Sequence, residues 1–268
     1  MREAIGIFDS GIGGLTVLKE IIKILPHEDI IYLGDTARVP YGIRSPETIL
    51  RYSYANADFL MDQKVKLLVI ACNTASSVST THLKERYRIP VIEVITPGAK
   101  RASEKTRKGK IGVIGTETTI KSGAYVKTIK AINHQLEVYP KACPLFVPLV
   151  EEGWVDENNE VSLKVAEEYL RELKEKGIDT LVLGCTHYPL LKGVIRKVMG
   201  HDIHLIDSAE ETAKEVLRVL SEKKLLSTDE DKGRLQFFVT DDPGRFQRMG
   251  FMFLKIEIRE VKRVETIT

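Results

Sequence analysis

Short runs of Val, Ile and Leu alternate with longer amphipathic segments along most of the 268 residues. This alternation is typical of parallel sheets covered by helices, because parallel strands are buried on both faces and need a long crossover between them. It predicts an α/β fold with mostly parallel sheets. The expected strands are residues 4–8, 30–33, 67–71, 91–94, 110–114, 136–139, 180–183 and 203–206.

Parts of this pattern recur with an offset of about 110 residues, a period too long for a solenoid. Three pairs of segments match in the same order: residues 5–8 with 111–114, 68–72 with 181–185 and, more weakly, 91–100 with 203–214. The repeat predicts two similar, pseudo-symmetric α/β domains that face each other, with an active site in the cleft between them.

The repeat also predicts where the domains divide. The first domain combines residues 1–97 with residues 207–268, and the second spans residues 98–206. In this division the last segment packs back against the first domain through a strand at 235–239, after an exposed charged connection at 223–232. Two helix starts are also expected, one at Pro46 after Ser45 and one from a capping box of Ser208 with Glu211.

Charge and cysteine content restrict the functional class. The net charge of +2 is too small to predict a nucleic-acid or membrane partner, and no apolar run approaches the roughly 18–20 residues that span a bilayer. Met1-Arg2-Glu3 leads directly into the first apolar run, which leaves no room for a signal peptide. Three cysteines are a poor basis for a disulfide framework and favour a reducing compartment. We therefore expect a cytoplasmic protein.

Two cysteines, Cys72 and Cys185, follow strands at equivalent places in the repeat. Ligands of open α/β sheets bind outside the carboxyl ends of the strands, so both thiols are expected in one cleft. Inverting a stereocentre through a planar carbanion needs a base on one face and an acid on the other, and a cysteine pair can supply both. Each cysteine precedes an apparent helix, whose dipole would favour the thiolate.

The other features are less specific. Cys143 is expected to be a packing residue, and no Cys-x-x-Cys or His-x₃-His spacing predicts a zinc site. The segment 9–14 is a glycine-rich turn that could cradle an anion or serve only as a tight turn, and it lacks the dinucleotide and P-loop fingerprints. The polar loop 34–42 is a candidate substrate loop.

The sequence resembles the glutamate racemases of the aspartate/glutamate racemase superfamily as far as about residue 210. The resemblance is carried by Phe8-Asp9-Ser10-Gly11-Ile12-Gly13-Gly14-Leu15, Gly34-Asp35-Thr36 with Val39-Pro40-Tyr41-Gly42, Ala71-Cys72-Asn73-Thr74-Ala75-Ser76, Cys143-Pro144-Leu145-Phe146-Val147-Pro148-Leu149-Val150-Glu151 and Gly184-Cys185-Thr186-His187-Tyr188-Pro189. It implies a cofactor-independent enzyme, commonly a homodimer, that interconverts L- and D-glutamate and supplies D-glutamate for peptidoglycan.

The resemblance also implies roles for individual residues. Cys72 and Cys185 match the paired acid/base cysteines, and Asp9, His187 and Glu151 match groups that assist them. The positions that match substrate contacts are Asp9, Ser10, Pro40, Tyr41, Gly42, Asn73, Thr74, Thr116, Thr119, Thr186 and His187. His187 could instead be a hydrogen-bonded core histidine, and Glu151 a solvated loop carboxylate.

Three rival functions stay open on the sequence alone. The chain could racemise aspartate or be another racemase of the superfamily, because no residue pattern measures the length of the substrate pocket. It could be a small-molecule or nucleotide-binding module without catalysis, for which the turn at 9–14 is the main support. A thiol redox protein is the third, although the cysteines lack Cys-x-x-Cys spacing.

Overall fold

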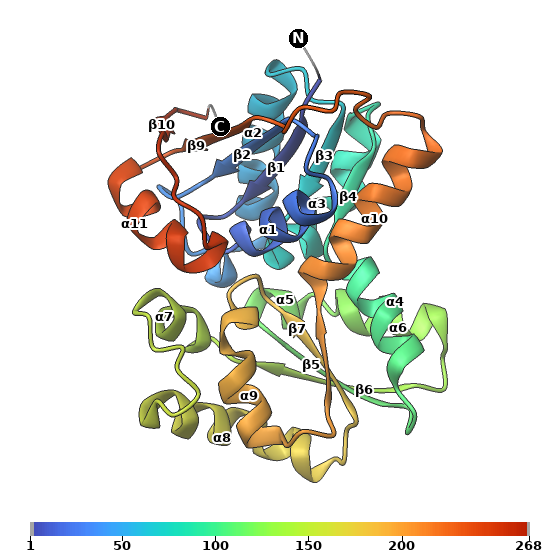
Figure 1. Cartoon of the computed structure of the whole chain (residues 1–268). Coiled ribbons are helices and arrows are strands. Elements are labelled where there is room, and N and C mark those ends of the chain that lie inside the picture. Colours follow the sequence, from blue (N-terminus) through green and yellow to red (C-terminus); the bar gives the residue numbers. More distant parts are fainter. Residues whose placement is uncertain (1–2, 267–268) are drawn as a thin grey trace.

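The computed structural model describes residues 3–266 and contains two parallel β-sheets covered by helices (Figure 1). In the first sheet the strand order is β10-β9-β2-β1-β3-β4, and every neighbouring pair is parallel. Its strands are β1 (Ile5–Asp9), β2 (Ile30–Gly34), β3 (Leu67–Ile70), β4 (Val91–Glu93), β9 (Leu235–Val239) and β10 (Lys262–Arg263).

The second sheet has the order β6-β5-β7-β8, again with every neighbouring pair parallel. Its strands are β5 (Lys110–Gly115), β6 (Glu137–Ala142), β7 (Thr180–Gly184) and β8 (His204–Asp207). This order repeats the β2-β1-β3-β4 order of the first sheet, strand for strand. The prediction of two similar α/β units with parallel sheets is therefore confirmed.

Helices cover both faces of each sheet. In the first sheet Ile5 and Ile7 pack on the side of α1, α10 and α11, whereas Phe8 packs on the side of α2 and α3, because alternate side chains of a strand point to opposite faces. The helices are α1 (Leu15–Ile24), α2 (Pro46–Asp62), α3 (Asn73–Arg86), α4 (Ile95–Lys105), α5 (Glu117–Lys121), α6 (Ala124–Ile132), α7 (Phe146–Glu151), α8 (Glu160–Glu175), α9 (Lys192–Met199), α10 (Ser208–Glu222), α11 (Pro243–Leu254) and two 3₁₀ turns, η1 (Tyr41–Ile43) and η2 (Tyr188–Leu191).

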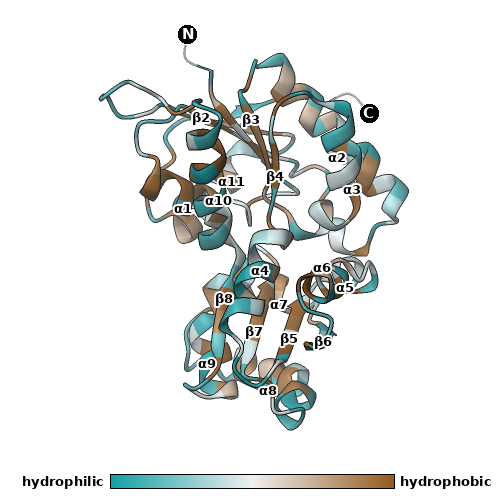
Figure 2. Cartoon of the chain, turned by 90° about the vertical axis from the view of Figure 1, so that its right-hand side faces the viewer, coloured by the Kyte–Doolittle hydropathy of each residue, from teal (hydrophilic) through white to brown (hydrophobic). Residues whose placement is uncertain are grey.

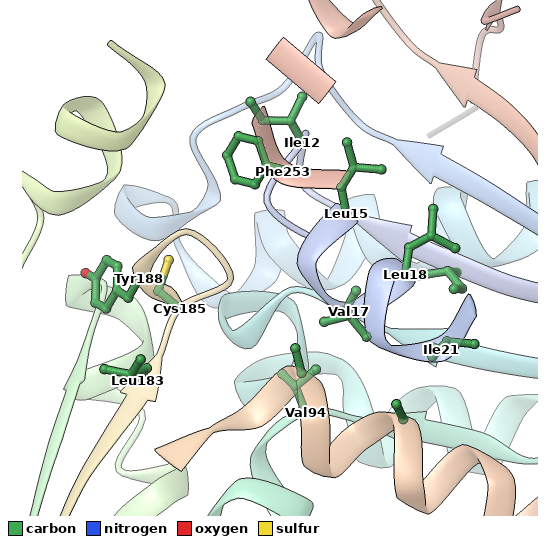
Figure 3. Packing of buried hydrophobic residues seen from close by; sticks show 14 of the residues in the cluster. Ile12, Leu15, Val17, Leu18, Ile21, Val94, Leu183, Cys185, Tyr188 and Phe253 are labelled. Atoms are coloured by element: carbon green, nitrogen blue, oxygen red, sulfur yellow. The ribbon is translucent and has the colours of Figure 1, made fainter. Parts of the chain in front are cut away.

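The second sheet is covered in the same way, by α4 and α6 on one face and by α8 and α9 on the other. Figure 2 shows the resulting distribution, with apolar strands inside and hydrophilic residues on the outer sides of the helices. One apolar cluster continues from one sheet to the other and includes Leu15, Cys185 and Phe253 (Figure 3). The two units are therefore joined by packed side chains next to the carboxyl ends of their strands.

The predicted domain division stays a prediction. Its first boundary, between residues 97 and 98, falls inside α4, and its second lies at the end of β8. After β8, helix α10 packs against α1 and strand β9 pairs with β2, while the connection at 223–232 is largely exposed. Residues 1–2 and 267–268, including the predicted absence of a leader at Met1-Arg2, lie outside the described residues.

One of the two predicted helix starts is confirmed. Ser45 caps α2 by accepting a hydrogen bond from the Thr48 N–H, with Pro46 in the first turn. The predicted capping box of Ser208 with Glu211 is wrong, because β8 extends to Asp207 and the Asp207 carboxylate caps α10 through the Ala209 N–H at 2.9 Å. The freed Ser208 hydroxyl donates instead to the Leu183 carbonyl at 3.1 Å.

Several bounds also differ from the sequence pattern. Strand β6 continues to Ala142, beyond the expected end at residue 139, and β8 is shifted by one residue. No sequence pattern predicted α11 or β10, which complete the first unit at the end of the chain. Within residues 3–266 no helix is long and apolar enough to span a bilayer.

Candidate active site

Strands β1, β3 and β7 end in the residues that sequence reasoning selected. Asp9 is the last residue of β1, Cys72 follows β3 and Cys185 follows β7. Because β1 and β3 are neighbouring parallel strands, Asp9 and Cys72 lie at the same edge of the first sheet. Both cysteines are free and nearly inaccessible, with Cys72 5% and Cys185 7% exposed.

Cys72 caps helix α3. Its sulfur accepts from the Ala75 N–H and the thiol donates to the Ser10 hydroxyl, each at 3.5 Å. Burial nevertheless raises the pKa of Cys72 to about 12, because desolvation and the neighbouring Asp9 charge outweigh both hydrogen bonds. Cys72 does precede a helix, as predicted, but burial rather than the helix N-terminus dominates its pKa and favours the neutral thiol.

Cys185 has a different environment. Three residues after it the 3₁₀ turn η2 begins, and η2 leads directly into α9 at Lys192, so the helical segment predicted after Cys185 starts with a 3₁₀ turn. Its sulfur lies 3.9 Å from His187 Nδ1, and His187 Nε2 lies 3.3 Å from Glu151 Oε1. In Figure 3 the Cys185 sulfur points away from β7 and toward the side on which Phe253 lies.

His187 carries the positive charge of this cluster. Its burial opposes protonation, but the Cys185 sulfur and the Glu151 carboxylate outweigh burial and raise the pKa of His187 to about 10. A pKa of about 10 favours the imidazolium form of His187 at neutral pH. The same pairing lowers the pKa of Glu151 below its usual range.

Asp9 is fully buried, and burial raises its pKa above the usual range in spite of His187 and the surrounding N–H groups. Its Oδ2 accepts from the Gly11 N–H at 2.8 Å. Among residues 3–266, its Oδ1 finds no hydrogen-bond partner. A buried acceptor without a partner is costly, so this oxygen is available to a donor that arrives from outside the chain.

Polar side chains from both units meet beside Cys72. The hydroxyl of Thr74 lies 2.9 Å from that of Thr116 and 3.3 Å from that of Thr119. The Asn73 amide donates to the Tyr125 hydroxyl at 2.8 Å. The structure therefore brings together residues of α3 and of the β5–α5 turn that the sequence proposed as substrate contacts, and it adds Tyr125, which the sequence did not suggest.

The loop after β2 borders this group. Gly42 accepts from the Thr118 hydroxyl at 2.9 Å and is buried, whereas Pro40, which follows a cis peptide bond, is exposed. The Tyr41 hydroxyl is not free, because it donates to buried Asp35 and accepts from Asn56 at 3.0 Å. As a result, the loop offers its backbone, rather than the Tyr41 hydroxyl, to a ligand.

The glycine-rich turn at 9–14 also contacts the second unit. The Thr16 hydroxyl donates to the Thr186 carbonyl at 3.0 Å, so the first turn of α1 is hydrogen-bonded to the residue that follows Cys185. A side chain at Gly13 would lie 2.2 Å from Thr186 Oγ1 and 2.5 Å from His187 Nδ1. Only a glycine allows the turn to approach His187 this closely.

Three further observations complete the site. Cys143 is fully buried in the apolar core. Glu151 also pairs through its Oε2 with Arg245 of α11, at 3.3 Å, a contact the sequence did not suggest. Within the described part of the chain, no group of three or more His, Cys, Asp or Glu side chains is placed to hold a metal ion.

Comparison with known proteins identifies relatives of the whole chain. The sequence profile of the Asp/Glu/Hydantoin racemase family matches residues 5–216. The glutamate racemase of Geobacter metallireducens is 57% identical over 262 residues, which cover 98% of this chain and 96% of that protein.

Two solved structures resemble the fold closely. The glutamate racemase isoform from Bacillus anthracis has a TM-score of 0.94 at 42% identity, with 98% of this chain and 97% of that chain covered. The glutamate racemase of Francisella tularensis, solved with D-glutamate, has a TM-score of 0.93 at 43% identity, with 99% and 98% covered.

Proposed function

Because this chain belongs to the Asp/Glu/Hydantoin racemase family and is an amino-acid racemase, we propose that it interconverts L- and D-glutamate by passing the α-proton between Cys72 and Cys185. The observation that carries the two-base mechanism is the pair of buried thiols at equivalent strand ends, β3 and β7, each with a polar partner of its own.

The two thiols have complementary tasks. One sulfur, as thiolate, removes the α-proton, and the electron pair of the broken C–H bond moves into the carboxylate as an aci-carboxylate. The other sulfur, as thiol, donates its proton to the opposite face of the same carbon. Its S–H bond breaks as the new C–H bond forms, so each turnover exchanges the roles of the two sulfurs and inverts the stereocentre.

The environments of the thiols support a defined resting state. The pKa of about 12 keeps Cys72 protonated, while the Cys185 sulfur lies 3.9 Å from His187 Nδ1. One thiol and one thiolate are what a two-base racemase needs. Their charges interact, because negative charge on Cys185 also raises the pKa of Cys72, so pH–rate profiles will report the pair rather than one residue.

The weak acidity of the α-proton is the main barrier, because the chemistry proposed here uses no electron-accepting cofactor. Hydrogen bonds aimed at the developing aci-carboxylate supply the stabilisation. The N–H groups that follow Asn73 and Thr186 are the proposed donors, whereas the N–H that follows Ser10, that of Gly11, already donates to Asp9 Oδ2 at 2.8 Å.

The remaining groups bind glutamate. We assign the substrate ammonium to the unpaired Oδ1 of Asp9, whose burial makes an unpaired state costly. The carboxylates bind to hydroxyl and N–H groups of the substrate contacts named from the sequence, namely Ser10, Asn73, Thr74, Thr116, Thr119, Thr186 and the backbone N–H groups of Tyr41 and Gly42. Pro40 has no N–H and contacts the substrate only through its ring or its carbonyl. His187 and Glu151 act on the Cys185 side.

The cellular role follows from the same resemblance. We propose a cytoplasmic homodimer that supplies D-glutamate for peptidoglycan.

The buried thiols also require that the two units separate to admit the substrate and close over it again.

The decisive experiment incubates the purified, reduced protein with D-glutamate in D₂O without added cofactor. Optical rotation should fall to zero while the α-position gains deuterium. Cys72→Ser should lose racemisation, whereas Cys143→Ala, which removes a thiol outside the site, should keep it. Racemisation by Cys72→Ser at near the wild-type rate would refute the two-base mechanism, and turnover of aspartate alone would refute the assignment to glutamate.

A further inference from the structure

Helix α11 contributes two side chains to the Cys185 side of the site. Arg245, in its first turn, pairs with Glu151 at 3.3 Å. Phe253, near its end, packs edge-on against the His187 ring, with centroids 5.4 Å apart and an interplanar angle of 87°. The helix thus touches both members of the His187–Glu151 pair, although it belongs to the first sheet's unit and they belong to the second.

Glu151 uses its two oxygens for different partners. Oε1 faces His187 Nε2 and Oε2 faces Arg245 Nη2, each at 3.3 Å. With both oxygens engaged, the plane of the carboxylate is fixed, and so is the direction from which it meets the imidazole. An imidazole oriented by a third group is a recurring way to align the group that acts on a nucleophile or base.

Glu151 has room to leave this arrangement. A cavity of about 120 Å³ borders the pair, and Glu151 and Arg245 are both among the residues that line it. The Glu151 side chain is 22% exposed, so water can reach it there. Without the Arg245 contact, the carboxylate can turn into this cavity and toward water, away from His187.

We propose that α11 is a positioning element for the Cys185 half of the reaction and that Arg245 is its positioning residue. Arg245 holds Glu151 against His187, and Phe253 holds the edge of the His187 ring, so that the imidazolium stays 3.9 Å from the Cys185 sulfur. This inference rests on the proposed two-cysteine function. Cys72 does not belong to this chain of contacts, because its sulfur contacts the Ser10 hydroxyl and the Ala75 N–H instead.

The experiment measures exchange of the substrate α-proton with D₂O in two variants that each keep one of the two active-site cysteines, Cys143 being present in both. Cys72→Ser leaves Cys185 as the only thiol base, and Cys185→Ser leaves Cys72. Each background should exchange one enantiomer of glutamate without inverting it. Arg245→Gln is then added to both, with Arg248→Gln as the matched control, because Arg248 lies on the same helix and takes no part in the Glu151 ion pairs of the described residues.

Arg245→Gln should slow exchange about fivefold in the Cys72→Ser background, the size expected for losing a partly exposed ion pair, and leave it unchanged in the Cys185→Ser background. Arg248→Gln should change neither rate. An equal loss in both backgrounds, or no loss in either, would overturn the inference. If neither the Cys72→Ser nor the Cys185→Ser protein exchanges either enantiomer, the two-base function itself fails, and the inference falls with it.

Discussion

Replacing Gly13 with alanine tests the geometry that joins the two units. The added Cβ would lie 2.2 Å from Thr186 Oγ1 and 2.5 Å from His187 Nδ1, whereas ordinary contact begins at 3.4 Å. The turn and the Thr186–His187 segment must therefore separate by about 1 Å. A misplacement of about 1 Å near reacting groups can cost on the order of 10²-fold in rate. Overpacking of this kind destabilises a fold by about 1–3 kcal/mol.

We therefore expect Gly13→Ala to fold but to lose about 100-fold in kcat. Racemisation followed by circular dichroism gives the rate, and thermal unfolding gives the stability. Gly11→Ala is the matched control, because a Cβ there meets only Val39 Cγ2, at 3.6 Å, in the same turn. It should keep both rate and stability. A folded Gly13→Ala protein with wild-type kcat would show that the turn does not hold His187 in its working position.

Three further predictions concern pH, substrate binding and stability. The pKa of His187 is raised from 6.5 to about 10, so the stability that its positive charge contributes is fully present below pH 6.5 and is lost as pH rises through 10. His187→Gln should therefore flatten the alkaline decline in the free energy of unfolding, measured by denaturant titration from pH 6 to 10. Tyr125→Phe removes the acceptor of the Asn73 amide and should raise KM for glutamate by about 5- to 10-fold with stability changed by about 1 kcal/mol; an unchanged KM would exclude Asn73 as a substrate contact. Lys66→Met leaves buried Glu28, now 2.6 Å from Lys66 Nζ, without its cation and should cost about 3–5 kcal/mol of stability, while kcat of the folded protein stays constant.

The parallel strands could be predicted because buried strands of this kind are nearly continuous apolar runs. Strands β1 and β7 are buried at every position, and their runs stand out in the sequence. Strand β6 is half-exposed along its length, so its apolar signal is weaker and its end was placed too early. Strand β10 consists of two exposed residues, Lys262 and Arg263, and owes its place to pairing with β9 alone.

Without the family resemblance, the site could be predicted only where a residue lies at or just after the end of a strand. Cys72 and Cys185 are fixed by the ends of β3 and β7, which the sequence marks. Arg245 and Glu151 are 94 positions apart, and no local pattern connects them. The Asn73–Tyr125 hydrogen bond likewise joins positions 52 apart. Such contacts depend on how the two units face each other, which is decided by packing and not by the periodicity of either strand.

The repeat makes the two thiols equivalent in sequence, and the structure makes them unequal. Cys72 is desolvated beside Asp9, whereas Cys185 faces an imidazolium held by Glu151. With equal surroundings, the single proton of the pair would reside on either sulfur, and only half of the molecules would be ready for a given enantiomer. In the two-cysteine reaction proposed above, the high pKa of Cys72 favours the proton on that sulfur, so we expect one enantiomer to find the pair ready for reaction. The other enantiomer requires the pair to exchange its proton first. The two directions can then differ in kcat and in KM, while equal free energies of the enantiomers keep kcat/KM the same in both.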